Sequence, residues 1–335
     1  MNMIRQNKIL IALFLLSLFI ITIVCSTMYG ATNYSVSTIW KSFVHFDSTN
    51  MEHLIIRSSR IPRVLGALLV GAFIAISGAL MQGMTRNYLA SPDIMGVTDG
   101  SVFIITISMI FLPNLQPLTL ILFSFVGSIL GVAFVFGIAK IIPGGLTPIS
   151  LVIIGTILGM FLSGVSQALA TYFQVSQNIS FWYNTRLHQI DPVMIQWAVP
   201  LAIIGLVIAL YVSKSVTAIS LGDEVAQGLG INIVVMKVLT LVSVALLTGV
   251  SVALVGKVTF IGLVIPHISR FLIGEDYKRI IPYAGLFGAL FFAWADILSR
   301  AINPPFETPV GVITALVGVP YFLYLIRIKG GKQHA

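Results

Sequence analysis

The residue types that carry enzyme chemistry match no catalytic motif in this sequence. It contains no His-Glu-x-x-His zinc motif, no paired cysteines and no recognisable Ser/His/Asp arrangement. Gly256-Lys257 is similar to the end of a phosphate-binding loop, but Ser251 stands where the first glycine belongs. Val258 stands where a Ser or Thr must hold magnesium. We therefore expect no catalytic residues and no binding of ATP by this loop.

Cysteine and histidine give no sign of a metal centre either. Cys25 is the only cysteine, so no disulfide framework is expected, and the five histidines show no metal-ligand spacing. The sequence predicts neither a metal site nor a cofactor bound by this chain.

Charged residues are missing from blocks as long as membrane-spanning helices. Between residues 100 and 185 the only charged side chain is that of Lys140. The sequence is 57% hydrophobic and 9% charged, with a mean hydropathy of +1.01, whereas soluble domains contain about 25% charged residues. A charged side chain at the bilayer centre costs about 2.5–3.5 kcal/mol, so the pattern predicts an all-α integral membrane protein that crosses the membrane many times.

Apolar runs bounded by charges, Pro or Gly predict about ten transmembrane helices in one domain covering residues 1–335. The first run lacks a convincing cleavage site, so we interpret it as a helix and not as a signal peptide. The runs at 97–112 and 258–269 are short for a full crossing, which is typical of helices that line transport paths. The ten helices are expected at 9–28, 62–84, 97–112, 117–140, 148–172, 192–212, 233–255, 258–269, 279–299 and 308–327.

Small residues and basic residues complete the membrane pattern. Gly127/Gly131 and Gly155/Gly159 are spaced so that helix backbones can approach closely, because lipid supplies no hydrophobic drive between helices. The net charge of +8 comes from basic residues scattered singly along the sequence, which argues against nucleic-acid binding. Their distribution favours an orientation with both termini in the cytoplasm.

The predicted helices also lack the buried Asp, Glu or Lys that ion-driven transporters place at mid-membrane, so coupling energy is expected to enter elsewhere. The polar cytoplasmic stretch 213–232 is the candidate for this role. It is predicted to contain a short helix near 220–230 that Ser220 caps and Gly230 ends, with Asp223 and Glu224 complementing its positive end.

Four blocks of the sequence resemble the FecCD family, the permease subunits of type II ABC importers that move iron(III)-siderophores. Haem and vitamin B12 permeases are relatives of that family. The blocks are Arg60-Ile-Pro-Arg63 with Ser77 to Gly83, then Asn87 to Gly96, Phe260 to Arg270, and Ala295 to Arg300 with Pro309 to Thr314. Together with the segment from Asp223 to Gly230 they follow the expected order over most of the chain.

The resemblance implies the ABC type II importer permease fold and a multi-pass location in the cytoplasmic membrane of a bacterium. It implies a second permease subunit, which is either a second copy or a related chain, and two cytoplasmic ABC ATPase subunits that bind ATP and magnesium. It also implies an extracytoplasmic siderophore-binding protein that delivers the iron(III)-siderophore.

The resemblance also implies three sets of functional residues. The set that couples to the ATPase is Leu221, Gly222, Asp223, Glu224, Ala226, Gly228 and Gly230. Arg60, Arg63 and Arg300 match positions that accept acidic residues of the binding protein, reinforced by Arg57 and Lys41, since arginine pairs bidentately with carboxylates. Thr147, Ser150 and Thr156 lie on the helix that lines the path.

Simpler interpretations stand beside these roles. The arginines could anchor helix ends, Arg300 could pair with Asp296 on its own helix, and the path residues could serve helix packing. The cargo could be haem or vitamin B12, and a secondary transporter driven by an ion gradient is the alternative from another class. Cargo-specific character or interfacial anchoring is expected in the outer segment 173–191, which contains Trp182, Tyr183, Arg186 and His188.

Overall fold

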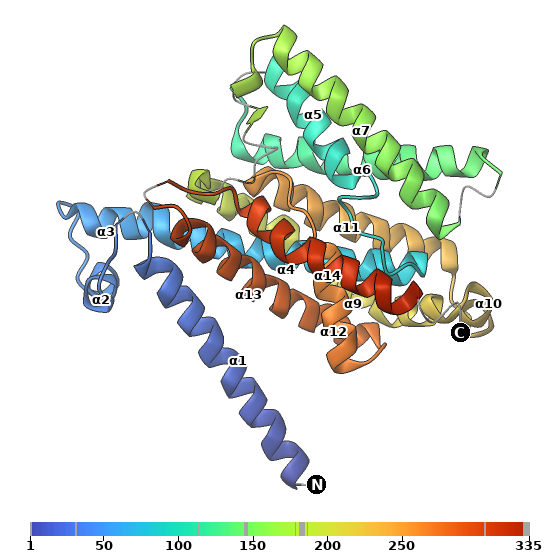
Figure 1. The fold of residues 1–335 in the computed structure, drawn as a ribbon, viewed down its shortest axis with the longest axis horizontal. Coiled ribbons are helices and arrows are strands. Elements are labelled where there is room, and N and C mark those ends of the chain that lie inside the picture. Colours follow the sequence, from blue (N-terminus) through green and yellow to red (C-terminus); the bar gives the residue numbers. More distant parts are fainter. Residues whose placement is uncertain are drawn as a thin grey trace.

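A computed structural model of the protein describes residues 2–30, 32–112, 114–143, 147–177, 179–180, 185, 187–304 and 306–330, and their regular secondary structure is helical (Figure 1). No strand occurs within these ranges. The elements are α1 Asn2–Met28, α2 Val36–Val44, α3 Met51–Ile55, η1 Ile56–Arg60, α4 Ile61–Thr85, α5 Val97–Phe111, α6 Pro117–Ile141, α7 Pro148–Tyr172, η2 Leu187–Gln189, α9 Pro192–Leu221, α10 Asp223–Gly228, α11 Ile233–Val255, α12 Ile261–Ile273, α13 Tyr277–Ala301 and α14 Val310–Gly330.

Each apolar run predicted as a membrane segment contains a helix, and the predicted all-α class is confirmed. The helix predicted at 258–269 begins later, at Ile261, and ends at Ile273. In the described part of the chain, six helices are long and apolar enough to cross a membrane. They end at Thr85, Ile141, Tyr172, Leu221, Val255 and Ala301. Two further apolar helices are shorter, Val97–Phe111 and Ile261–Ile273, and α1 and α14 contain the apolar segments Leu13–Met28 and Val310–Tyr321. Six crossings are therefore supported by length and composition, and ten crossings remain a prediction.

The helix predicted at 192–212 is longer than expected, because α9 continues to Leu221. The sequence also gave no indication of helices between α1 and α4. There the Ser35 hydroxyl caps α2 by accepting a hydrogen bond from the Thr38 amide, and the Asn50 side chain caps α3 in the same way. These short helices form the end of the molecule opposite α10 (Figure 1).

Helix α4 is the centre of the bundle and packs against α9, α11, α12 and α13. It is buried along almost its whole length, including Val64, Phe73 and Met81. Glycines allow this close packing: a methyl group on Gly71 would meet the backbone of Gly288 in α13, and one on Gly78 would meet the backbone of Gly262 in α12. Small residues at helix interfaces are the usual solution in membranes, where packing replaces the hydrophobic drive.

Helices α5, α6 and α7 form a second group, which joins the first through contacts of α5 and α6 with α11 (Figure 1). The predicted packing role of the glycine pairs is confirmed here. Gly127 and Gly131 of α6 meet the backbone of residues 96–101 from one side, and Gly155 of α7 meets Ile94 and Met95 from the other. The start of α5 is therefore held between two glycine-lined helices.

The two helices predicted to be short are short in the structure, with 15 residues in α5 and 13 in α12. At 1.5 Å per residue they extend about 22 and 20 Å, less than the hydrocarbon thickness of about 30 Å. Their amino-terminal regions lie close together, since a methyl group on Gly262 would be 3.2 Å from Cδ of Pro92. The two short helices α5 and α12, which we call interrupted because neither is long enough for a full crossing, thus start near each other inside the bundle.

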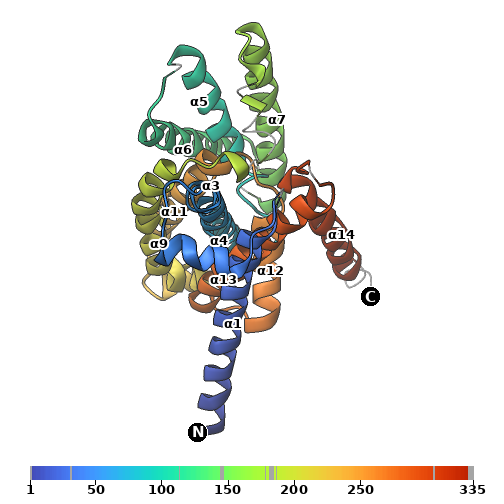
Figure 2. The ribbon, with the colours of Figure 1, turned by 90° about the vertical axis from the view of Figure 1, so that its left-hand side faces the viewer.

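Helices α7 and α14 lie on the same side of the molecule, and α9 lies on the opposite side (Figure 2). Helices α7 and α14 carry exposed apolar side chains, among them Ile157 and Met160 on α7 and Val312 and Leu316 on α14. Helix α14 on this side also lines the larger of the two cavities described below.

Candidate functional site

Five charged residues form a network at the α3 end of the bundle, and we name Arg60, Arg63, Asp296, Arg300 and Glu307 the charge network. Asp296 is its centre and is fully buried. Nη2 of Arg63 lies 2.7 Å from Oδ1 of Asp296, and Nη2 of Arg300 lies 2.9 Å from its Oδ2. One carboxylate therefore holds two guanidinium groups from two different helices, α4 and α13.

The network also fixes the end of α1. Arg300 donates to the carbonyl oxygen of Ser26 at 2.9 Å and to that of Tyr29, while Nη1 of Arg60 donates to the Tyr29 carbonyl at 2.9 Å. Nη2 of Arg60 donates to the Thr32 carbonyl at 3.0 Å. Arginines thus pair with one free carbonyl in the last turn of α1 and with two carbonyls just beyond it.

The predicted docking residues are brought together by the structure, and all three are buried. Arg60, Arg63 and Arg300 are 6–8% exposed, and their donors are bonded inside the chain. The predicted pairing of Asp296 with Arg300 is confirmed. Arg57 and Lys41 are exposed at this end, with the Arg57 guanidinium 4.0 Å above the Phe46 ring.

Glu307 is the part of the charge network that reaches the surface. Its Oε1 lies 2.7 Å from Nη1 of Arg63, and its Oε2 lies 3.5 Å from Nδ1 of His188. Burial alone would raise the pKa of Glu307, but hydrogen bonds and charge from His188 and Arg63 outweigh it and lower the pKa to about 2. The carboxylate is therefore ionised at any physiological pH.

This pKa predicts a pH dependence of stability that belongs to Glu307. Because the folded pKa lies below the unfolded value of 4.5, the stabilisation is full above pH 4.5 and is lost as the pH falls towards 2. The variant Glu307→Gln is expected to reduce the loss of thermal stability between pH 5 and pH 3 in detergent. Glu52→Gln, an exposed glutamate at the same end, is the control, and equal pH profiles for both variants would contradict the assignment.

Helix α10 forms the short helix predicted near 220–230, although its cap differs from the prediction. Ser220 lies inside α9, where its hydroxyl donates to the Thr217 carbonyl at 2.7 Å, and the residue at the amino-terminal cap of α10 is Gly222. The prediction of a Ser220 cap is wrong because α9 continues through the polar stretch. Gly230 has a φ of +77°, the left-handed conformation that ends helices, so the predicted termination there is confirmed.

The coupling candidates divide into a buried side and an exposed side. Ala226 is fully buried against Ala218 and Ile219 of α9. Leu221 at the end of α9 is 66% exposed, and two residues outside the predicted set, Val225 in α10 and Leu229 at its carboxy-terminal cap, are 47% and 67% exposed. We name these three residues the apolar stripe. Glu224, Gly228 and Gly230 are also exposed. Exposed apolar side chains on and beside a short helix are typical of a protein contact surface.

Asp223 holds α10 against its neighbours. Its Oδ2 lies 2.9 Å from Nζ of Lys237 in α11, and its Oδ1 lies 3.8 Å from Nη2 of Arg86 after α4. The carboxylate thereby ties α10 to two helices of the central bundle. A displacement of α10 is expected to act directly on α4 and α11.

The predicted path residues lie along α7. Thr147 caps that helix, with its hydroxyl accepting from the Ser150 amide at 3.3 Å and donating to the Ser150 hydroxyl at 2.8 Å. Thr156 is exposed, and its hydroxyl donates to the Val152 carbonyl at 2.8 Å. Local hydrogen bonds thus satisfy the hydroxyl donors of Thr147 and Thr156.

An ion pair in the interior of the bundle was missed by the sequence reasoning. Nζ of Lys257 lies 2.6 Å from Oδ1 of Asp99, whose side chain is 5% exposed. Asp99 is in the first turn of α5 and Asp296 is in α13, so the prediction that the helices lack buried acidic residues is wrong. The signal was available, since Asp99 falls inside the run predicted as a helix at 97–112.

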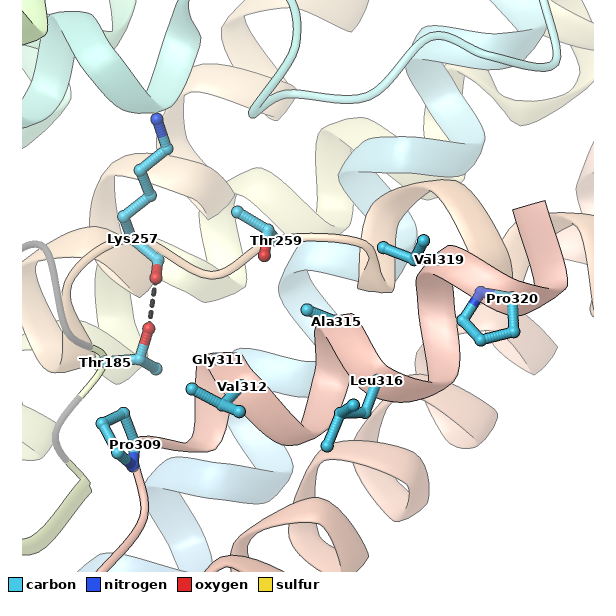
Figure 3. A pocket seen from close by; sticks show the side chains of 10 residues that line it. All are labelled: Thr185, Lys257, Thr259, Pro309, Gly311, Val312, Ala315, Leu316, Val319 and Pro320. Atoms are coloured by element: carbon cyan, nitrogen blue, oxygen red, sulfur yellow. Dashed lines mark hydrogen bonds between the residues drawn. The ribbon is translucent and has the colours of Figure 1, made fainter. Parts of the chain in front are cut away.

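Two cavities adjoin these charges. One of about 600 Å³ lies between the loop containing Lys257 and one face of α14, where Gly311 and Ala315 line it (Figure 3). The other, of about 410 Å³, is lined by Arg63, His188 and Glu307. Thr185 and Pro309 line both cavities, so the two are neighbours. Of the outer segment predicted to carry cargo-specific character, Trp182, Tyr183 and Arg186 lie outside the described residues.

Comparison with known proteins places this arrangement among transport permeases. The model of the FecCD transport family matches residues 18–328. The iron-uptake system permease protein FeuB of Bacillus subtilis (strain 168) is 51% identical over 307 residues, which cover 92% of each chain. The iron(3+)-hydroxamate import system permease protein FhuB of the same organism is 45% identical over 298 residues, covering 89% of this chain and 78% of that protein.

Among solved structures, an inward-facing transporter described as of the metal-chelate ABC type superposes with a TM-score of 0.80. Its sequence is 28% identical, and the match covers 96% of this chain and 99% of that chain. Fold and sequence family therefore agree over nearly the whole length.

Proposed function

The chain belongs to the FecCD transport family, and we propose that it is the permease subunit of an ABC importer that translocates iron(III)-siderophores. It is a multi-pass protein of the bacterial cytoplasmic membrane. The proposal includes the ABC type II importer permease fold with ten transmembrane helices, of which α5 and α12 are short.

The observation that carries the proposal is that the charge network and the apolar stripe lie at opposite ends of one bundle. The charge network lies at the α3 end, and the apolar stripe on α10 lies at the opposite end (Figure 1). Helices α4 and α13 extend between them, since both contribute to the charge network and both pack in the central core. A permease needs this geometry, because cargo is delivered on one face and ATPases act on the other.

Partner subunits are proposed for both ends and for one side. The apolar stripe would enter a groove on a cytoplasmic ATPase, which binds ATP and magnesium in place of this chain. The exposed apolar faces of α7 and α14 would pack against a second permease subunit, a copy or a related chain. Thr147, Ser150 and Thr156 would then line a central path of weakly polar groups.

At the α3 end, an external siderophore-binding protein would dock on the charge network. Since the arginines are already bonded inside the chain, docking would bring a carboxylate of the binding protein into competition with Glu307 for Arg63. Exposed Arg57 and Lys41 would attract the acidic partner before contact. A carboxylate exchange of this kind lets arrival of the cargo alter the contacts between α4 and α13.

The function is tested by iron uptake in an iron-starved strain that lacks the gene. Restoring the gene is expected to restore uptake of labelled iron from siderophores of one chemical class, and the panel includes hydroxamates, catecholates, carboxylates, haem and cobalamin. Rescue by haem or cobalamin alone would replace the proposed cargo and retain the importer. Absence of rescue by any ligand would contradict the proposed function.

The apolar stripe makes a prediction about assembly with the ATPase. Val225→Asp is expected to lower the yield of ATPase that co-purifies with the permease by at least about tenfold, because burying a lone carboxylate in an apolar interface costs several kcal/mol. Val44→Asp is the matched control, since Val44 is 52% exposed on another short helix, at the opposite end. Equal yields for the two variants would contradict the role of the stripe.

A further inference from the structure

Lys257 and Asp99 meet where the two interrupted helices begin. Asp99 is in the first turn of α5, and Lys257 lies in the loop just before α12. Backbone amides that have no intrahelical partner give the start of a helix a partial positive charge. In transporters, such interrupted helices commonly frame the site through which an anionic group passes.

Neutral residues could fill the structural role of this ion pair. Two charges withdrawn from water lose several kcal/mol of solvation each, and a well-packed apolar pair is often as stable. An ionisable residue inside a membrane domain therefore marks a candidate functional site. No part of the proposed docking or coupling uses this pair.

The cation is the accessible member of the pair. The Lys257 side chain is 25% exposed, whereas the Asp99 side chain is 5% exposed and lies against Gly159 of α7. A lysine ammonium has three donors, and among the described residues Asp99 is the acceptor that the structure places on it. Two donors thus remain for an acceptor that arrives from outside the pair.

The cavity beside Lys257 adjoins a second cavity at the α3 end of the bundle. The carbonyl of Lys257 accepts from the Thr185 hydroxyl, and its side chain extends from the loop away from α14 (Figure 3). Thr185 lines both the cavity beside Lys257 and the cavity of Arg63 and Glu307. Among the described residues, the rest of the lining of this cavity is Thr259, proline, glycine and apolar residues, and the Lys257 ammonium itself points away from α14, to Asp99.

We propose that Lys257, held by Asp99, is a subsite for an anionic oxygen of the ferric chelate in transit. The inference rests on the proposed function and specifies its cargo: a negatively charged catecholate or carboxylate chelate, in preference to an uncharged hydroxamate chelate. Before cargo arrives, Asp99 compensates the buried charge of Lys257. An anionic chelate then bonds to the free donors of the ammonium, and no covalent bond changes.

The test uses the complete complex of permease, ATPases and binding protein in proteoliposomes, with labelled ferric catecholate, ferric citrate and ferric trihydroxamate as probes. Wild type is expected to take up an anionic chelate. Lys257→Met should lower that uptake by about tenfold, because a hydrogen bond to a charged group is lost. Lys257→Arg should keep most of it, and Asp99→Asn should keep it because the cation remains.

The double variant Asp99→Asn with Lys257→Met distinguishes a cargo subsite from a structural tie, and thermal stability is measured for every variant. A subsite predicts that the double variant transports as poorly as Lys257→Met. The inference is overturned if the double variant recovers towards wild type, if Asp99→Asn loses as much uptake as Lys257→Met, or if wild type carries only the uncharged chelate. Those results leave the proposed function intact, whereas a wild-type complex that carries no ferric chelate overturns both.

Discussion

Replacing Asp296 with asparagine is expected to lower the free energy of unfolding by about 3–5 kcal/mol, the range measured when one partner of a buried ion pair is removed. Asp296 is fully buried and accepts hydrogen bonds from Arg63 and Arg300. Asparagine has nearly the same shape, so the change removes the charge without opening a cavity. Two buried guanidinium groups would then lack their shared counter-ion.

The control is Asp276→Asn on the same helix. Asp276 is at the opposite end of α13, its side chain is 48% exposed, and its role as an amino-terminal cap is one that asparagine fills equally well. Its effect should stay within about 0.5 kcal/mol, as for other surface substitutions. Denaturation in mixed micelles measures both variants, and equal unfolding free energies would show that Asp296 is not the anchor of the charge network.

The same substitution is expected to impair docking. Arg300 and Arg60 hold the Tyr29 carbonyl, and Arg63 holds Glu307, so loss of Asp296 frees the groups that fix α1, α4 and α13 relative to each other. Binding of the external protein should weaken, and its salt dependence should change. A variant with normal affinity and normal salt dependence would contradict the proposed docking face.

Much of the fold could be predicted from the sequence because the membrane imposes a simple rule. A lipid-exposed backbone must satisfy its hydrogen bonds internally, so long apolar runs become helices. The run at 148–172 and the run at 233–255 match α7 and α11 at both ends. The glycine pairs of α6 and α7 also predicted close approach correctly, because only glycine leaves the room that the start of α5 occupies.

The charged contacts could not be predicted in the same way, since their partners are far apart in the sequence. Asp99 and Lys257 are 158 positions apart, and Arg63 and Asp296 are 233 apart. A sequence pattern reveals a partner three or four residues away on one helix, which is why the pair of Asp296 with Arg300 was anticipated. Whether an arginine at a helix end faces water or an internal carboxylate depends on the helix beside it.

The ends of the helices were also difficult to predict from the sequence. Apolar periodicity stops near residue 212, yet α9 continues to Leu221 because Val212, Val216 and Ile219 remain fully buried. Tertiary packing therefore overrode the polar composition of the stretch, and Ser220 became part of a helix instead of its cap. The apolar stripe on α10 could be seen only after this boundary was known, since Leu221 ends one helix and Val225 belongs to the next.

Gly78→Ala is expected to be the most disruptive change of a single methyl group in the central bundle. The new carbon would be 2.5 Å from the Gly262 Cα and closer still to the carbonyl of that residue. Because these atoms are backbone, no rotamer change can make room, and α4 and α12 must separate. Overpacking of this kind costs about 1–3 kcal/mol where side chains can adjust, and we expect a loss at or above the upper end of that range.

Separation of α4 from α12 would also disturb the hydrogen bonds between them. Nε2 of Gln82 donates to the Leu263 carbonyl at 3.2 Å, and Arg270 donates to Oε1 of the same glutamine. Iron uptake should therefore fall even where Gly78→Ala protein reaches the membrane. Gly137→Ala is the matched control, because no atom lies within 4 Å of its added methyl group. Alanine favours a helix over glycine by about 1 kcal/mol, so the control should be neutral or stabilised.

The yield of monodisperse protein after detergent extraction and the melting temperature measure both variants. Equal losses for Gly78→Ala and Gly137→Ala would mean that the α4–α12 approach is not the constraint. A low melting temperature for Gly78→Ala alone, combined with reduced uptake per folded molecule, is the expected result. It follows from the geometry because the segment that starts α12 also carries the loop with Lys257, so the spacing of α4 and α12 fixes where that lysine meets Asp99.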